Sequence, residues 1–402
     1  MMFTQILGSY DLSYTNDCSR SETNVEFPKL EKTRSSEVAR VRDTFEKLHL
    51  LLRAANSAFL MGNLGKASST LHDALALFQK LENSKAIGIA NNNLGNVMLA
   101  MYRTMNKNSM PTIAGLSRKQ VISKGCTYFK SAIDSGEEAL ERINTTEGWS
   151  ENYLVFMQQL SNRYFNRAMF LLTVRNDHPH PDEAENQGLT DLSTCRDMDR
   201  EVVDNGERVG FKGDEDVYFE LLLGRIKGML LLMKMGYDDV WGIDELFGDA
   251  QDALAAAIRS PEKRLFRSLD PSGQMQRLDG ALIEYYLLLV ERVDKAGVEN
   301  VSGERQENVM KAAEIGIRML VEDDYVIGDA AMLALRALVE MTSSSCRAED
   351  LGGSDPSDVR STLLHYRHQI NEEMVLLQIS RGVVSRECSA ATTVGGFSME
   401  TF

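Results

Sequence analysis

Two histidines and two carboxylates occur within six residues of this sequence, in the segment His178-Pro-His-Pro-Asp-Glu183. Imidazole nitrogens and carboxylate oxygens both bind zinc, so this segment could hold a metal ion. However, a proline separates the two histidines, and the flanking residues are polar. Both features favour a loop without a rigid scaffold or a second shell of hydrogen bonds. We therefore predict a solvent-exposed loop here and no metal site.

A second histidine pair, His365 and His368, is three residues apart on the last predicted helix. Both would face one side of that helix, where they could bind a metal or respond to pH. No glutamate stands between them in the spacing of zinc proteases, so we interpret them as surface or interface residues. Two acidic stretches, 237–239 and 322–324, lack the alternating ligands and central glycine of a calcium loop. We interpret these stretches as turns and helix caps.

Catalytic signatures are missing from the chain. The phosphate-binding patterns Gly-x4-Gly-Lys-Ser/Thr and Gly-x-Gly-x-x-Gly do not occur, nor does the nucleophile pattern Gly-x-Ser-x-Gly. We therefore predict that the protein is not an enzyme and has no cofactor. The five cysteines are widely separated and form no Cys-x-x-Cys pair, which indicates reduced thiols in a cytosolic protein: Cys18, Cys126, Cys195, Cys346 and Cys388.

The net charge of the chain argues against some classes of binding partner. Its 402 residues carry a formal net charge of −15, with an isoelectric point near 5.0. Such a surface repels phosphate backbones and anionic lipids, so we expect neither nucleic acid nor membrane binding. The N-terminus has no secretory signal pattern, and charged residues interrupt or bound the longest apolar stretches. The sequence thus predicts a soluble cytoplasmic protein.

The elements that would position any site are predicted to be helices. Leu, Ala, Met, Glu and Lys dominate the ordered stretches, only seven prolines occur, and strand-type alternation is almost absent. Apolar residues recur at helical spacing from Val38 to Phe59, and further helical patterns follow in pairs. The predicted helices after the first repeats are 149–173, 195–209, 214–235, 243–259, 275–293, 306–321, 327–342 and 356–379.

These patterns divide the chain into five predicted segments. Residues 1–35 form a flexible arm and 381–402 a flexible tail. Repeated helix pairs span 36–175 with an inserted loop at 104–121, and divergent helical hairpins span 195–380. A polar loop at 176–194 separates the two helical parts.

Small residues mark where two helices cross closely. Ala55 lies mid-way along the first helix, Gly62-Asn-Leu64 forms a turn, and Ala67 and Ala74 follow on the second helix. The run Asn93-Leu-Gly-Asn96 repeats the first-helix pattern about 40 residues later. This pattern resembles the longer-period tetratricopeptide repeats of kinesin light chains and spindle-orientation adaptors. The resemblance implies an all-α fold, a right-handed superhelix of about six helical hairpins whose C-terminal pairs are divergent.

In such a superhelix the first helix of each pair lines a concave face; these are called the first helices below. Side chains next to the small residue of each first helix point into that face. The resemblance places seven residues there: Asn56, Asn92, Asn93, Asn96, Arg163, Arg167 and Arg225. Asparagine can bond both groups of a peptide backbone, and arginine can grip a carboxylate. The set is similar in part to the carboxylate clamp of chaperone-binding repeats, although Leu52 occupies the position of that clamp's first lysine. The alternative is that these asparagines are repeat consensus and the arginines are solvated helix surface.

The sequence therefore favours a protein-binding scaffold or adaptor that holds an extended, acidic peptide segment along a concave helical groove. The alternative function is a regulatory helical module of a signalling enzyme or multiprotein complex. A third class, an enzyme with a novel helical site, has no support in the sequence.

Overall fold

A computed structural model describes residues 50–81, 83–147, 150–209, 215–239, 241–259, 271–296 and 302–321. The chain divides into two compact units, Met1–Ala257 and Ile258–Phe402. The division falls within a helix and not at the predicted polar loop 176–194. The predicted arm, the tail, the last helix pair and its histidines His365 and His368 lie outside the described residues.

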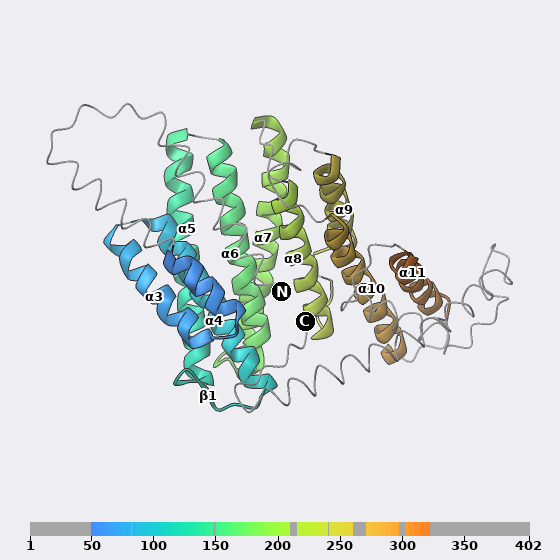
Figure 1. Ribbon diagram of the computed structural model, residues 1–402, viewed down its shortest axis with the longest axis horizontal. Helices are drawn as coiled ribbons and strands as arrows, with labels where there is room; N and C mark the ends of the chain where they lie inside the picture. Colours follow the sequence, from blue (N-terminus) through green and yellow to red (C-terminus); the bar gives the residue numbers. More distant parts are fainter. Residues whose placement is uncertain are drawn as a thin grey trace. The chain divides into compact units, whose positions relative to one another are not determined.

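The all-α prediction is confirmed for the described residues (Figure 1). In the first unit, residues 50–60 are helical, and the longer helices follow as α3 Leu64–Lys80, α4 Ser84–Lys107, α5 Arg118–Glu147, α6 Glu151–Val174, α7 Pro181–Val209, α8 Glu215–Lys234 and α9 Ile243–Arg259. In the second unit, α10 Pro271–Ala296 packs against α11 Ser302–Val321. The helices predicted at 149–173, 214–235, 243–259, 275–293 and 306–321 correspond to α6, α8, α9, α10 and α11.

The helices of the first unit pack as stacked pairs. Consecutive helices contact each other from α3 through α7, and α4 also contacts α6, which in turn contacts α8. Helices α4, α6 and α8 therefore contact one another in a row, and α4 and α6 also contact their hairpin partners α5 and α7. This pattern is typical of helical repeat proteins, in which each pair buries its apolar face against the neighbouring pair.

Local signals in the sequence explain where these helices begin. Gly62 adopts a left-handed conformation with φ of 72°, which turns the chain, and the side chain of Asn63 accepts a hydrogen bond from the backbone of Lys66 at the start of α3. Asn83 caps α4 in the same way by accepting from Ala86. The predicted turn at Gly62-Asn-Leu64 is thus confirmed.

The predicted small positions are close-packing positions. Ala55, Ala67 and Ala74 are at most 2% exposed. A Cβ on Gly95 of α4 would lie 2.6 Å from the ring of Phe129 on α5, so the absent side chain makes room for that ring. Gly125 of α5 receives the ring of Phe170 of α6 in the same manner. The two aromatic rings pack with centroids 5.4 Å apart, which continues the contact across three helices.

Two segments differ from the sequence expectation. The insertion predicted at 104–121 contains a β-hairpin in which β1 Thr112–Ile113 pairs with β2 Leu116–Ser117. Ala114 and Gly115 at its tip both have positive φ, 49° and 76°, as a two-residue hairpin turn requires. So short a hairpin leaves no run of alternating residues in the sequence to reveal it.

The polar loop predicted at 176–194 is wrong, because α7 begins at Pro181 and continues through this segment. Proline suits the first turn of a helix, and Asp182 and Glu183 complement the positive end of the helix dipole there. The polar residues of the segment mostly occupy the exposed face of α7, whereas Ala184 and Leu192 are buried.

Candidate functional site

The asparagines predicted to line an open face are largely buried. Asn92, Asn93 and Asn96 of α4 are 7%, 6% and 0% exposed, and only Asn56 is half-buried. Asn92 accepts a hydrogen bond of 3.1 Å from the carboxamide of Asn166 on α6. That bond joins two neighbouring first helices, so Asn92 has a structural partner within the chain.

Arg163 of α6 is also buried, with 4% exposure. Its Nη1 donates a hydrogen bond of 2.7 Å to the backbone oxygen of Ala132 on α5. The guanidinium fills the space left by Gly88 of α4 and Gly136 of α5, because a Cβ on either glycine would clash with it. Arg163 therefore packs between helices and does not face an open groove.

Arg167 already holds a carboxylate of the same chain. Its Nε and Nη2 each donate a hydrogen bond of 2.7 Å to Asp191 of α7, whose side chain is 1% exposed. Gln187 donates a further bond of 2.8 Å to the same carboxylate. Arg167 was expected to bind a partner's carboxylate through two parallel hydrogen bonds. It makes this bidentate contact with a carboxylate of its own chain instead.

Arg225 of α8 lies at the centre of a buried polar network. Its guanidinium donates to Asp199 of α7 at 3.2 Å, and to Asn162 and Ser161 of α6 at 3.1 Å and 3.2 Å. It is 1% exposed, and its central carbon lies 4.3 Å from the ring centroid of Phe165. This network joins α6, α7 and α8 and leaves Arg225 inaccessible in this structure.

These placements correct the expected exposure of the three arginines. The carboxylate partners of Arg167 and Arg225 are Asp191 and Asp199, which lie on α7 in or beside the segment predicted to be a loop. A signal was nevertheless present, because Ala184, Gly188, Asp191, Cys195 and Asp199 recur every three or four residues and would share one helix face. Replacing Arg163 or Arg167 by alanine would remove hydrogen bonds within the chain, so both arginines stabilise the packing of the helices.

Four carboxamide atoms on the first helices have no such internal partner. Asn56 Oδ1, Asn96 Oδ1, Asn96 Nδ2 and, on α6, Gln159 Oε1 are buried and make no hydrogen bond to any residue that the structure describes. Buried polar groups are normally paired, so each unpaired atom calls for a water molecule, a ligand or a cost in stability. Asn92 and Asn96 are one turn apart on α4, yet only Asn92 is bonded to α6 through an observed contact.

This contrast predicts different effects of two alanine substitutions on the free energy of unfolding. Asn92→Ala is expected to lower the free energy of unfolding by about 1–3 kcal/mol, because it leaves the buried Asn166 donor unpaired. Asn96→Ala removes an unpaired carboxamide and is expected to leave stability unchanged or raised. Urea unfolding followed by circular dichroism measures both. A loss for Asn96→Ala as large as that for Asn92→Ala would show that Asn96 has a partner of equal importance.

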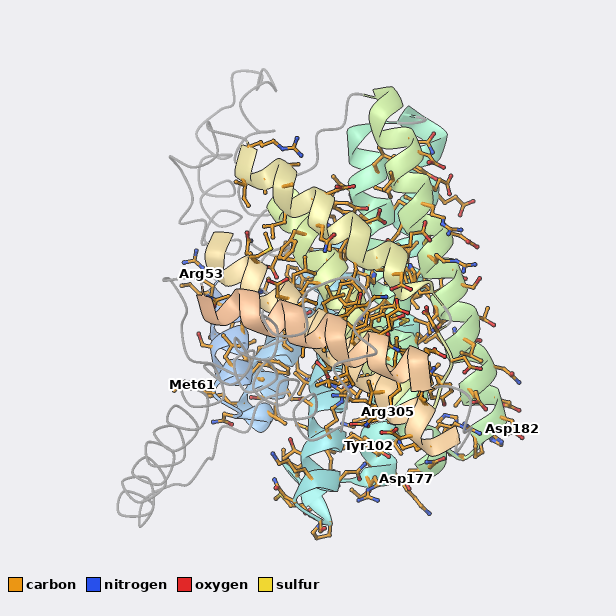
Figure 2. The ribbon with its side chains drawn as sticks, turned by 90° about the vertical axis from the view of Figure 1, so that its right-hand side faces the viewer. Arg53, Met61, Tyr102, Asp177, Asp182 and Arg305 are labelled. Carbon is orange, nitrogen blue, oxygen red and sulfur yellow. The ribbon has the colours of Figure 1, made fainter. Side chains whose placement is uncertain are left out.

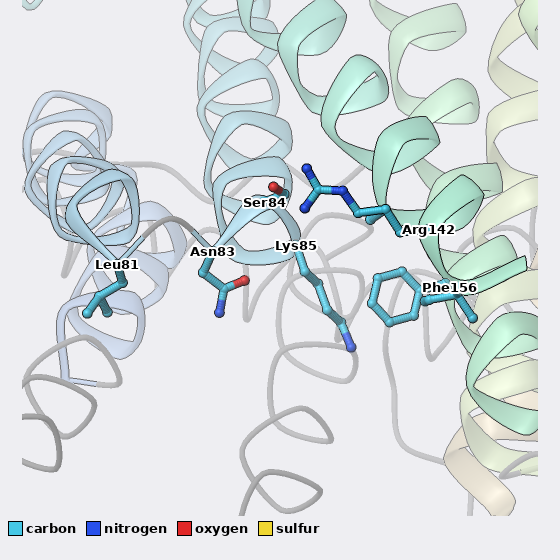
Figure 3. Close-up of a pocket in the computed structure, with 8 residues that line it drawn as sticks. Leu81, Asn83, Ser84, Lys85, Arg142 and Phe156 are labelled. Carbon is cyan, nitrogen blue, oxygen red and sulfur yellow. The ribbon is translucent and has the colours of Figure 1, made fainter. Parts of the chain in front are cut away.

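A pocket of about 430 Å³ opens at the start of α4 (Figure 3). Its walls come from the end of α3, the first turn of α4, the C-terminal part of α5 and one aromatic residue of α6. The lining residues are Leu81, Asn83, Ser84, Lys85, Ala139, Arg142, Ile143 and Phe156. Two of them are basic, and no described lining residue is acidic. Sequence reasoning missed this pocket because its residues come from helices far apart in the chain.

The histidine segment at the other end of α6 lies beside a small polar cluster. Tyr102 donates a hydrogen bond of 2.9 Å to Asp177, and Arg118 forms an ion pair of 3.2 Å with the same carboxylate. Figure 2 shows Tyr102 and Asp177 together, with Asp182 farther along the surface. His178 lies 3.7 Å from the sulfur of Cys126. Among the described residues, no three His, Cys, Asp or Glu side chains are grouped so that they could hold a metal ion.

Comparisons with known proteins identify no family. No family model and no curated protein matches the chain. One solved structure matches, a "circular tandem repeat protein with novel repeat topology and enhanced subunit contact surfaces", at 14% identity and a TM-score of 0.31. The match covers 85% of this chain and 78% of the other. Within the part of the chain that the structure describes, no helix is both long enough and apolar enough to cross a membrane.

Proposed function

We propose that this chain is a protein-binding scaffold that holds an extended peptide segment against its first helices. The observation that carries the proposal is the set of unpaired carboxamide atoms on successive first helices, at Asn56, Asn96 and Gln159. A carboxamide offers both a donor and an acceptor, which is the complement of a peptide backbone.

The packing of the first unit supports the same function. Helices α4, α6 and α8 contact one another in succession, so residues at equivalent positions recur along neighbouring helices. Repeat proteins use such surfaces to bind extended partners. Asn56 is half-buried, whereas Asn96 is closed to solvent. A partner that reaches Asn96 must therefore displace neighbouring side chains.

Peptide selection tests the proposal directly. Random-sequence peptides displayed on phage would be selected against the immobilised full chain, and enriched peptides would be titrated by fluorescence anisotropy. We expect the double variant Asn56→Ala/Asn96→Ala to bind these peptides about tenfold or more weakly, a loss of about 1.4 kcal/mol. Asn186→Ala is the matched control, because Asn186 is an exposed asparagine of α7 and does not belong to a first helix.

Two results would contradict the proposed function. One is that no peptide is enriched over a surface without protein. The other is that the double variant and the control bind the enriched peptides as the unmodified chain does, which would remove the carboxamides from the binding role.

A further inference from the structure

The pocket at the start of α4 has a charge arrangement that does not serve helix stability. Lys85 is the second residue of α4, and the first turn of this helix contains no acidic residue. A positive charge in the first turn faces the positive end of the helix dipole, where a carboxylate would be favourable. Departures of this kind from local stability rules are expected at functional sites.

A second cation comes from a different helix. Figure 3 shows Arg142 extending from α5 toward Ser84 in the first turn of α4. Its guanidinium is also paired with Glu138, one turn earlier on α5, and both side chains of this pair are more than half exposed. Exposed ion pairs of this type contribute little to stability. Lys85 and Arg142 thus bring two positive charges to one pocket in a chain whose net charge is −15.

Phe156 supplies an apolar wall beside these charges. The Lys85 ammonium lies 4.1 Å from the centroid of the Phe156 ring, which holds the ammonium over the aromatic face. Ala139 and Ile143 add further apolar surface. A ligand that fits has an anionic head and a short apolar stem. The volume of about 430 Å³ is large enough for one such side chain and part of its backbone.

We propose that this pocket binds the carboxylate of a glutamate or aspartate side chain of a bound peptide. Lys85 and Arg142 contact the carboxylate, the first turn of α4 contributes its positive end, and Phe156 packs against the methylene stem. This assignment rests on the proposed scaffold function and adds its charge preference. It assigns the acid-binding role to Lys85 and Arg142, which line the pocket, and not to Arg163, Arg167 and Arg225, which bond to α5 and α7 between packed helices.

A pair of charge-matched variants tests the assignment. The probe is a fluorescein-labelled peptide of alternating glutamate and alanine, with the glutamine–alanine peptide as its neutral isostere, titrated into the full chain at low ionic strength. We expect the glutamate peptide to bind about tenfold or more tightly than the glutamine peptide. Lys85→Ala/Arg142→Ala should abolish this preference. Lys66→Ala/Lys130→Ala removes the same charge from exposed positions outside the pocket and should retain it.

The remaining outcomes separate this proposal from the scaffold function. Equal losses in the two double variants would overturn the pocket assignment, because only the net charge would then matter. Displacement of the glutamate peptide by inorganic phosphate at equal concentration would also overturn it, in favour of a site for small free anions. If selected peptides depend on Asn56 and Asn96 but not on Lys85 and Arg142, the pocket assignment fails and the scaffold function stands.

Discussion

Arg225→Ala is expected to lower the free energy of unfolding of the first compact unit by about 3–5 kcal/mol. The substitution removes three hydrogen bonds and leaves the carboxylate of Asp199, which is 15% exposed, without its cation. It also removes the cation–π contacts of the guanidinium with the rings of Phe165 and Trp241. Breaking a buried ion pair on one side is costly because the remaining charge stays buried.

Urea unfolding followed by circular dichroism measures this loss, and thiol labelling locates it. Cys195 is fully buried beside the network, and burial raises the pKa of its thiol, so alkylation by iodoacetamide should be slow in the unmodified chain. Arg225→Ala should speed alkylation of Cys195, as resolved by mass spectrometry of its peptide. Lys130→Ala, which removes an exposed cation, serves as the control. Equal stability of the two variants would contradict the structural role of the network.

Gly125→Ala is expected to destabilise the first unit by about 1–3 kcal/mol. A Cβ at this position would lie 2.7 Å and 2.9 Å from two ring atoms of Phe170 and closer still to a third, so the buried ring must move. This cost exceeds the gain of up to about 1 kcal/mol that alanine brings to a helix interior. Gly248→Ala on α9 is the matched control, because nothing lies within 4 Å of the Cβ it would add. That control should gain stability.

A second substitution shows whether the clash is the cause. Phe170→Leu removes the ring that enters the space at Gly125, so it should reduce the cost of Gly125→Ala when the two are combined. Thermal and urea unfolding of the four proteins in this cycle give the coupling energy. Additive effects would mean that the glycine is required for another reason than contact with Phe170.

The helix-forming part of the fold could be predicted from the sequence. Apolar spacing located α6 and α8 to α11 to within a few residues, and the turn at Gly62 and the caps at Asn63 and Asn83 agree with the chemistry of those residues. The small residues at Ala55, Ala67 and Gly95 were correctly interpreted as close-contact positions. These features depend on residues near one another in the chain, so local physics determines them.

For the candidate site, the sequence predicted the types of the residues but not their binding partners. The sequence indicated arginines that grip carboxylates, and Arg167 and Arg225 do so, but the carboxylates belong to Asp191 and Asp199 of the same chain. Predicting a loop at 176–194 hid Asp191, since a loop would not hold this residue against α6. The peptide-binding roles of Asn56, Asn92, Asn93 and Asn96 remain predictions.

The amino-acid sequence by itself determined that this chain forms paired helices with close crossings, because helical periodicity and small side chains act over one or two turns. Only the tertiary structure decided which polar groups are satisfied internally and which lie at a pocket. That decision depends on neighbours 24 to 74 positions away, such as Asp191 for Arg167 and Asn92 for Asn166. Spacing along one helix gives the direction of a side chain but does not specify which helix packs in front of it.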